Sequence, residues 1–293
     1  MRPLVAALLL TIAAAAAGQP TAATPYADRA EVKRFIRSMV ERHGFVESEL
    51  VTLFSRLYRV EPVLQAIVTP AEITRWSDYR PIFVNAKRIE GGLAFWKAQQ
   101  KTLARAERTY GVPAPIIVAI IGVETSYGRN AGRWRVVEAL ATLAFDYPPR
   151  AGFFRGELEN YLLLARDADV DVFSVRGSYA GAIGIPQFMP SSLRRYAVDF
   201  DRDGKIDLSR NNADAIGSVA NFLKQHGWRR GQPLQRKDGE ADEAAGERAI
   251  DLGTEKRVGL ANFQVLMRYN RSPLYAAAVA DLAEALAAQR GGK

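Results

Sequence analysis

Residues 113–128 read PAPIIVAIIGVETSYG and decide the fold. Pro113 and Pro115 suit the first turn of a helix, where the missing N–H costs nothing. The run that follows is apolar on every side, which is typical of a helix inside a hydrophobic core. Glu124 stands in its last turn, and Gly128 is a natural end for the helix. We therefore expect a buried helix that carries one carboxylate at its end.

Helical periodicity extends in both directions from this segment. Apolar residues recur at three- and four-residue steps upstream, at Val32, Phe35, Ile36, Met39 and Val40, and again at Leu50, Val51, Phe54, Leu57 and Tyr58. A third helix is expected at about 88–110, after an irregular connection around Trp76, Tyr79 and Phe83. Downstream, we expect helices at 134–145, 156–166, 213–226, 264–269 and 274–289. Strand-like alternation is scarce, so the predicted fold class is mainly α.

The composition leaves few residue types for catalysis. The chain has 293 residues, of which 48% are hydrophobic and 25% charged, as in ordinary globular proteins. It has no cysteine and only two histidines, His43 and His226. Disulfides, thiolate metal sites and cysteine nucleophiles are therefore excluded, and histidine clusters nearly so. Carboxylates are the main catalytic candidates that remain.

The formal net charge of +8 favours anionic surfaces such as acidic polymers, cell-wall material or lipid head groups. The basic residues are scattered and no nucleic-acid motif is present, so we expect no nucleic-acid partner. We also expect no transmembrane span, because no segment after the N-terminus is long and apolar enough.

The N-terminus has the features of a secretory signal peptide. Arg2 precedes an apolar run from Leu4 to Ala17, and Ala15 and Ala17 form an A-x-A cleavage pattern. We expect a signal peptide at 1–17 and a linker at 18–26; the alternative is an N-terminal anchor or core helix. No cysteine follows the run, so we do not expect a lipoprotein.

Glu124 is the candidate for acid–base chemistry. A charged carboxylate at the end of an apolar helix is costly, so burial is expected to raise its pKa. A carboxylic acid that is still protonated near neutral pH can donate its proton to a glycosidic oxygen. From its position alone, a Glu that merely leaves the core toward solvent is an equal alternative.

Seven ordered motifs resemble one known family. They are VETSYG (123–128), ALATLAFDYPPRAGFF (139–154), GELENYLLLARD (156–167), GSYAGAIGIPQFMPSS (177–192), YAVDFDRDGKIDL (196–208), DAIGSVANFLKQHGW (214–228) and RYNRSPLY (268–275). The segment YRPIFVNAKRIEGGLAFW, residues 79–96, is similar as well. Together they resemble the membrane-bound lytic murein transglycosylase B family of lysozyme-like glycoside hydrolases, in its soluble form, over almost the whole chain.

The resemblance implies both a fold and a reaction. The fold would be a lysozyme-like catalytic core at 109–273 with a small irregular or β excursion at 235–258. An additional helical region would lie at 27–108 and pack with a C-terminal helix at 274–290. The reaction would cleave the β-1,4 bond between N-acetylmuramic acid and N-acetylglucosamine of peptidoglycan and leave a 1,6-anhydro-muramic end. Glu124 would be the single catalytic acid and then base, assisted by the substrate's acetamido group, without the usual second carboxylate.

The resemblance also implies the substrate-binding residues, namely Ser178, Gln187, Phe188, Tyr269, Asn270, Tyr275 and Arg150. Ser and Gln can bind acetamido and hydroxyl groups, and an aromatic face can cover a sugar ring. From spacing alone, a structural turn at 177–192 with Phe188 in the core is the favoured reading. The family often has two arginines after its Tyr-Pro pair, whereas Pro149 precedes Arg150 in this chain. Phe222 stands where a relative has tyrosine.

The segment 199–214 predicts a structural calcium site. Asp199, Asp201 and Asp203 alternate before Gly204, and Lys205 would add a backbone carbonyl, as in the start of an EF-hand loop. Position twelve is Arg210 instead of Glu, so the resemblance implies closure by Asp214, with Asp207 as the alternative. A solvated acidic turn is the reading without a metal, and no organic cofactor is expected.

Peptidoglycan glycan strands are the expected partner, and the periplasm is the expected location. Enzymes of wall synthesis are a further partner class that no residue identifies. Two alternatives stay open: a hydrolytic muramidase, in which water attacks, and a non-catalytic calcium-stabilised protein that binds the wall.

Overall fold

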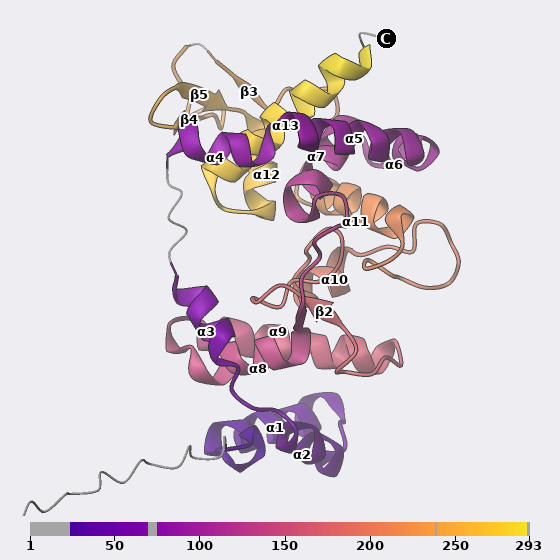
Figure 1. Ribbon diagram of the computed structural model, residues 1–293, viewed down its shortest axis with the longest axis vertical. Coiled ribbons are helices and arrows are strands. Elements are labelled where there is room, and N and C mark those ends of the chain that lie inside the picture. The colour runs from indigo at the N-terminus through magenta and orange to yellow at the C-terminus, as the bar shows by residue number, and fades with distance from the viewer. Residues whose placement is uncertain (1–23, 70–74, 238, 292–293) are drawn as a thin grey trace, which may run out of the picture.

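The computed structural model describes residues 24–69, 75–237 and 239–291 of the chain. The predicted signal peptide, and the linker up to residue 23, lie outside this part. The described residues form a mainly helical molecule, as predicted, built around two hydrophobic cores that lie one above the other along its long axis (Figure 1).

The first core surrounds the helix that the sequence placed at the centre, and we call it the α7 core. In α7 (Ala114–Thr125) only Pro115 and Glu124 are not buried. Its neighbours are α4 (Trp76–Phe83), α5 (Ala86–Ala98), α6 (Gln100–Tyr110), α11 (Asn212–Gln225), α12 (Ala261–Tyr269) and α13 (Pro273–Gly291).

The second core, the α8–α9 core, contains the start of the described chain. It is formed by the 3₁₀ helix η1 (Tyr26–Asp28), α1 (Ala30–His43), α2 (Glu47–Ser55), α3 (Glu61–Val68), α8 (Val136–Asp146) and α9 (Ala151–Asp167), with the 3₁₀ turn η2 (Pro148–Arg150) between the last two. The predicted region 27–108 is thus divided. Its first helices share a core with α8 and α9, whereas α4 packs on α13 and α5 packs on both α7 and α13. Apolar periodicity shows that a helix has a buried face, but it does not identify the helix that covers that face.

Two local predictions differ from the structure. The expected helix at 88–110 is two helices, α5 and α6, that meet at Gln99. The expected irregular connection around Trp76 is the helix α4, which holds Pro81 near its end. A proline there removes one hydrogen bond but does not prevent the preceding turn from forming.

The polar excursion at 235–258 forms a small antiparallel sheet beside α4 and α12 (Figure 1). Its strands are β3 (Gln235–Arg236), β4 (Arg248–Asp251) and β5 (Lys256–Gly259), in the order β3-β5-β4. A two-stranded ribbon of β1 (Trp134–Arg135) and β2 (Arg176–Gly177) lies between the cores, as does the short helix α10 (Pro190–Tyr196).

Within the described residues, no single helix meets the length and hydropathy needed to cross a membrane. Helices α6 and α7 meet that test only as a pair, and they are bent by 114° at their junction.

The loop at 177–192 joins the two cores. Ile183 is buried in the α8–α9 core, whereas Ile185 and Phe188 are buried in the α7 core. Gly184 stands between them with φ +73°, and a Cβ there would lie 2.4 Å from the carbonyl oxygen of Leu208. The Ile185 N–H donates to that same oxygen at 2.7 Å. Only glycine fits at position 184, where the loop passes from one core to the other.

We therefore expect Gly184→Ala to lower the free energy of unfolding by about 2–3 kcal/mol, because the cost of a left-handed backbone conformation adds to the cost of a clash between the new Cβ and the Leu208 carbonyl. Gly227 is the matched control, since its φ is +92° with nothing within 4 Å of a Cβ. Gly227→Ala should cost only about 1 kcal/mol. Urea unfolding of both variants measures the difference, and equal losses would contradict the clash.

Candidate active site

Glu124 lies in the last turn of α7, directly before a backbone turn that several contacts hold in place. Ser126, Tyr127 and Gly128 have φ values of +53°, +65° and +82° in succession. The buried Thr125 holds the turn, because its Oγ1 donates to the carbonyl of Ile185 at 2.9 Å and accepts from the Gly128 N–H at 2.9 Å. The carboxylate therefore has a fixed position beside the loop that joins the cores.

The Tyr127 ring fixes the same turn from the other side. It lies against glycines of α5 and α7: a Cβ at Gly92 would lie 2.5 Å from its hydroxyl, and one at Gly122 would lie 2.7 Å away. The Tyr127 hydroxyl donates to the Arg88 carbonyl at 2.7 Å, and the Arg88 guanidinium donates to the Gly122 carbonyl. The last turn of α7 is thus tied to α5 through both partners.

The Glu124 side chain is surrounded by tyrosines. The buried Tyr275 donates a hydrogen bond from its hydroxyl to Glu124 Oε1 at 2.6 Å. Burial, and then the nearby Glu124 charge, raise the pKa values of Tyr79 and Tyr269. All three tyrosines therefore stay neutral near pH 7.

The expected rise in the pKa of Glu124 is confirmed. Burial raises its pKa from 4.5 to about 7, and the hydrogen bond from Tyr275 opposes part of that rise. Near neutral pH the carboxyl group is therefore divided between its acid and ionised forms. Such a group can give a proton in one step and take one in the next.

Of the predicted binding residues on the joining loop, Gln187 lies where it can face a ligand. It is half-buried with φ +52°, and its Nε2 donates to the carbonyls of Ala131 at 3.1 Å and Gly184 at 2.8 Å. It lines a cavity of about 660 Å³ together with Tyr269. Ser178 is used within the loop, because its Oγ accepts from the N–H groups of Ala180 and Ala182 at 3.2 and 3.0 Å.

Phe188 also lines this cavity, but little of its side chain is open to a ligand. Its side chain is only 2% exposed and packs against Phe222 and Tyr269. This is the core position that spacing alone favoured. Its ring supports Tyr269, whose hydroxyl donates to the Pro186 carbonyl at 2.6 Å.

Asn270 and Arg150 are exposed and differ in their surroundings. Asn270 follows Tyr269 at the end of α12, and its Oδ1 accepts from the Ser272 N–H at 3.1 Å. Arg150 lies in η2, where its guanidinium covers the rings of Phe153 and Phe154 at 4.3 and 5.3 Å. Among the described residues, Arg150 has no contact with the Glu124 group.

The predicted metal loop brings three carboxylates together. Oxygen atoms of Asp199, Asp201 and Asp203 lie within 4.8 Å of one another. Asp214 is fully buried beside them, where its two oxygens accept from the N–H groups of Phe200 at 2.7 Å and Asp207 at 2.9 Å. From the end of the loop, Asp214 thus holds the backbone near its start, at Phe200, and in its middle, at Asp207. The Lys205 side chain is exposed, as expected for a residue that would offer only its carbonyl.

Sequence reasoning gave no role to Tyr79 or Arg88. Tyr79 follows Trp76 at helical spacing and stacks on it, so the pattern resembles ordinary core packing. The usable signal was that both residues lie in 79–96, the upstream segment that resembled the family.

These features define a lysozyme-like enzyme site around the partly buried Glu124, and the comparisons with known proteins agree in the class of enzyme. The family model described as the Transglycosylase SLT domain matches residues 27–257 and 235–284. Membrane-bound lytic murein transglycosylase B of Escherichia coli (strain K12) is 39% identical, covering 90% of this chain and 85% of its own length. The chain therefore belongs to the transglycosylase SLT family, and it is a lytic transglycosylase that acts on peptidoglycan.

Solved structures share both sequence and fold. The soluble lytic transglycosylase SltB1 from Pseudomonas aeruginosa is 47% identical with a TM-score of 0.81, covering 89% of this chain and 99% of that chain. The Escherichia coli lytic transglycosylase Slt35 in complex with calcium is 39% identical with a TM-score of 0.82, covering 91% and 95%. SltB3 from Pseudomonas aeruginosa in complex with NAG-anhNAM-pentapeptide is 28% identical with a TM-score of 0.76, covering 88% and 79%. The predicted enzyme class is therefore confirmed, and the alternative of a non-catalytic wall-binding protein is excluded.

Proposed function

We propose that this chain cleaves the β-1,4 bond between N-acetylmuramic acid and N-acetylglucosamine and closes a 1,6-anhydro ring, with Glu124 as the only acid and base. The observation that carries the proposal is the Glu124 carboxyl group, which has a pKa of about 7 and accepts a hydrogen bond from Tyr275 at 2.6 Å. In the described part of the chain, the side chains that interact with Glu124 are tyrosines, and no second carboxylate is among them.

The first step needs the protonated form of Glu124. It gives its proton to the glycosidic oxygen, and the bond from that oxygen to C1 of the muramic residue breaks. The substrate's acetamido oxygen stabilises the electron-poor C1 carbon, which replaces the missing second carboxylate. The Tyr275 hydroxyl holds the carboxyl group in place and stabilises the carboxylate that forms.

The second step uses the ionised form. Glu124 takes the proton of the substrate's 6-hydroxyl, whose oxygen attacks C1 and closes the anhydro ring. The acid is then restored for another turnover. Gln187, Tyr269 and Asn270 are the side chains that we assign to sugar binding beside Glu124. The anhydro-muramoyl ligand in the SltB3 complex supports a product of this type.

Mass spectrometry of digested, purified peptidoglycan tests the reaction. We expect fragments that are lighter by one water than the products of hydrolysis. Fragments with ordinary reducing ends would instead assign the chain to the hydrolytic muramidases, in which water takes the place of the 6-hydroxyl.

We also propose that the loop at 199–214 holds a structural calcium ion. Three converging carboxylates are the oxygen donors that calcium prefers, and the Lys205 carbonyl can add a fourth. The calcium complex of Slt35 supports this assignment. Asp214 closes the loop by holding its ends together through the backbone.

Removal of calcium should therefore destabilise the protein. A chelator is expected to lower the melting temperature by about 5 °C or more, because a ligand bound only by the folded state stabilises it. Added calcium should restore the value, and Asp201→Asn should abolish the response. Asp167→Asn, an exposed Asp paired with Arg166, is the control that keeps it. An unchanged melting temperature with chelator would remove the calcium site.

The proposed place of action is the periplasm. The apolar run at 4–17 and the peptidoglycan substrate both support export, and the net charge of +8 favours an anionic wall.

A further inference from the structure

The hydroxyl of Thr125 connects the turn after Glu124 to a second segment of the chain. Thr125 directly follows Glu124 and is 2% exposed. Its one proton has two carbonyl oxygens within reach, that of Ile185 at 2.9 Å and that of Ile121 at 3.4 Å, so the contact to Ile185 is the stronger one. Ile121 belongs to the same helix, whereas Ile185 belongs to the loop at 177–192. The side chain therefore joins α7 to that loop.

The backbone of Ile185 extends this connection to a third segment. The Ile185 N–H donates to the Leu208 carbonyl at 2.7 Å, and Leu208 lies within the loop at 199–214. Two hydrogen bonds in series thus lead from Leu208 through Ile185 to Thr125, and we call this series the Thr125 link. All three residues are buried, so little water competes for either bond.

The end of the Thr125 link at Leu208 has a fixed position. The Leu208 side chain is buried in the α7 core. On one side of it, the Asp207 N–H donates to Asp214 at 2.9 Å. On the other side, the Ser209 N–H donates to Asp207 Oδ1 at 2.9 Å. The Leu208 carbonyl can therefore act as a fixed point for the segments that bind to it.

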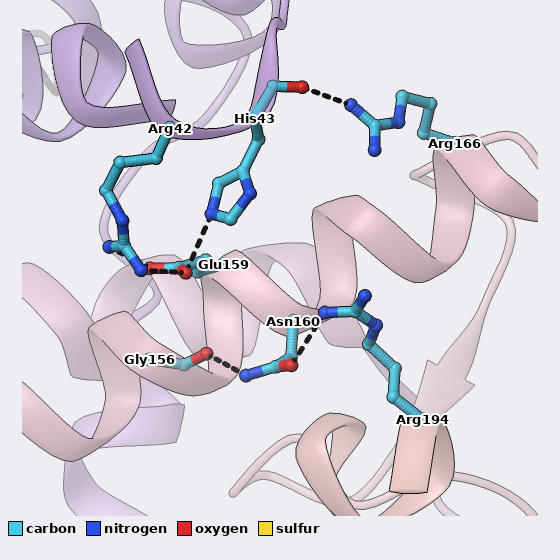
Figure 2. A network of polar contacts seen from close by, with 7 residues as sticks. All are labelled: Arg42, His43, Gly156, Glu159, Asn160, Arg166 and Arg194. Carbon is cyan, nitrogen blue, oxygen red and sulfur yellow. Dashed lines mark hydrogen bonds and ion pairs between the residues drawn. The ribbon is translucent and has the colours of Figure 1, made fainter. Parts of the chain in front are cut away.

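The far end of the loop that joins the cores is held separately. It leads into α10, where the Ser191 hydroxyl and N–H donate to Glu157 of α9 at 2.7 and 2.9 Å. Figure 2 shows a second contact between these helices, from Arg194 of α10 to Asn160 of α9, at 3.1 Å. Loss of the Thr125 hydroxyl therefore leaves this end in place and frees only the part beside Glu124.

We propose that Thr125 is a positioning residue for the reaction, whose hydroxyl holds the Glu124 carboxyl group at the place set by the loops at 177–192 and 199–214. This inference rests on the proposed function, in which Glu124 is the acid and base. Thr125 is buried and acts through the backbone next to Glu124. A displacement of a reacting group by about 1 Å can cost about a hundredfold in rate, so the Thr125 link should affect kcat. The sugar contacts that we assign to Gln187 and Tyr269 should keep KM near its wild-type value.

The position of the Glu124 carboxyl group also determines how strongly it holds its proton. Burial is the largest cause of its raised pKa of about 7. A carboxyl group that leaves this place is better solvated, so its pKa falls toward 4.5. The first step needs the protonated acid, so kcat/KM falls as the pH rises through this pKa. The pH at which that fall occurs therefore reports the position of Glu124, and a general loss of stability does not move it.

The test measures kcat, KM and the pH dependence of kcat/KM on purified peptidoglycan. Thr125→Val keeps the shape of the side chain but removes the hydroxyl. It should lower kcat by about 10- to 100-fold with KM nearly unchanged, and it should move the fall in kcat/KM to a pH lower by about one unit. Thr125→Ser keeps the hydroxyl, so it should restore both kcat and the pH of the fall to near their wild-type values.

A second variant breaks the Thr125 link one step farther from Glu124. Gly184→Ala places a Cβ against the Leu208 carbonyl, to which Ile185 donates, and leaves Thr125 unchanged. It should move the fall in kcat/KM in the same direction. In the double variant with Thr125→Val the shift should be smaller than the sum of the two single shifts, because both changes act on one series of contacts.

Thr142→Val is the matched control. Thr142 of α8 is also fully buried, and its Oγ1 accepts from the Val60 N–H at 3.1 Å, but it lies in the α8–α9 core. This variant should lower the melting temperature, as Thr125→Val does, and should keep the wild-type kcat and pH dependence. Melting temperatures identify the range in which each variant is folded, and all rates are measured within it.

The outcomes separate this inference from the proposed function. A wild-type kcat and pH dependence in Thr125→Val, or the same changes in Thr125→Ser or Thr142→Val, overturn the positioning role while cleavage to anhydro products stands. A shift in Thr125→Val without one in a folded Gly184→Ala overturns the link to the loop at 199–214. If Gly184→Ala does not fold, the comparison of Thr125→Val with Thr125→Ser decides. Failure of the wild-type chain to form anhydro ends overturns the proposed function itself.

Discussion

Glu124→Gln should reduce cleavage of peptidoglycan by about 10³-fold or more, because the amide can neither give the proton in the first step nor take one in the second. The amide keeps nearly the same size and can still accept the hydrogen bond from Tyr275, so substrate binding should persist. Release of soluble fragments measures activity, and co-sedimentation with insoluble wall measures binding. Glu90→Gln, at an exposed Glu of α5, is the matched control. Wild-type cleavage by the Glu124 variant would place the proton donor elsewhere.

The same variant should reveal the free energy cost of placing an acid at the end of this apolar helix. Between pH 4.5 and about 7 the folded chain keeps the Glu124 proton, whereas the unfolded chain loses it. The folded state therefore binds more protons, and this group makes the free energy of unfolding fall as pH rises through that window, by about 3 kcal/mol in total. In Glu124→Gln this part of the pH dependence should disappear. Parallel stability curves for the variant and the wild type would contradict the raised pKa.

Asp281→Asn should destabilise the fold by about 3–5 kcal/mol, because it leaves a buried arginine without its counter-charge. Asp281 of α13 is 6% exposed and Arg257 of β5 is 4% exposed. Arg257 Nη1 donates to Asp281 Oδ1 at 2.6 Å, and Arg80 Nε of α4 donates to Oδ2 at 2.6 Å. One carboxylate thus joins three elements of the α7 core.

Thermal unfolding measures this loss, and a fall in melting temperature of about 10 °C is expected. Burial alone would raise the pKa of Asp281, but the hydrogen bonds from Arg257 and Arg80 outweigh it and hold the pKa below 3.8. The stabilisation is therefore present above pH 4 and is lost as the pH falls through the lowered pKa, so the variant and the wild type should converge in acid. Glu284→Gln, at an exposed position of the same helix, should have little effect. A difference that persists in acid would contradict the ion pair as its cause.

The sequence predicted those features of the fold that depend on a local pattern of residues. The run at 116–123 is apolar on every side, and all eight of its residues are buried in α7. Glu124 interrupts that run, and the same pattern predicted its raised pKa. The glycine- and acid-rich stretch at 235–258 lacks helical periodicity, and it forms the small sheet.

What the sequence could not predict depends on contacts between distant segments. The residues next to Phe188 in the sequence do not indicate whether its ring lies in the core or faces a sugar. Its packing on Phe222 and Tyr269, which are distant in the sequence, shows that the ring lies mostly in the core. Tyr79 approaches Glu124 because α4 packs on α13, and the sequence of neither helix indicates that the two will pack together.

The division of the chain between its two cores has a mechanical consequence. The backbone enters the α8–α9 core, passes to the α7 core, returns with α8 and α9, and crosses once more at Gly184. Two of these connections, at 126–135 and at 177–192, lie within the described residues, so the two cores stay covalently joined if either of them is cut.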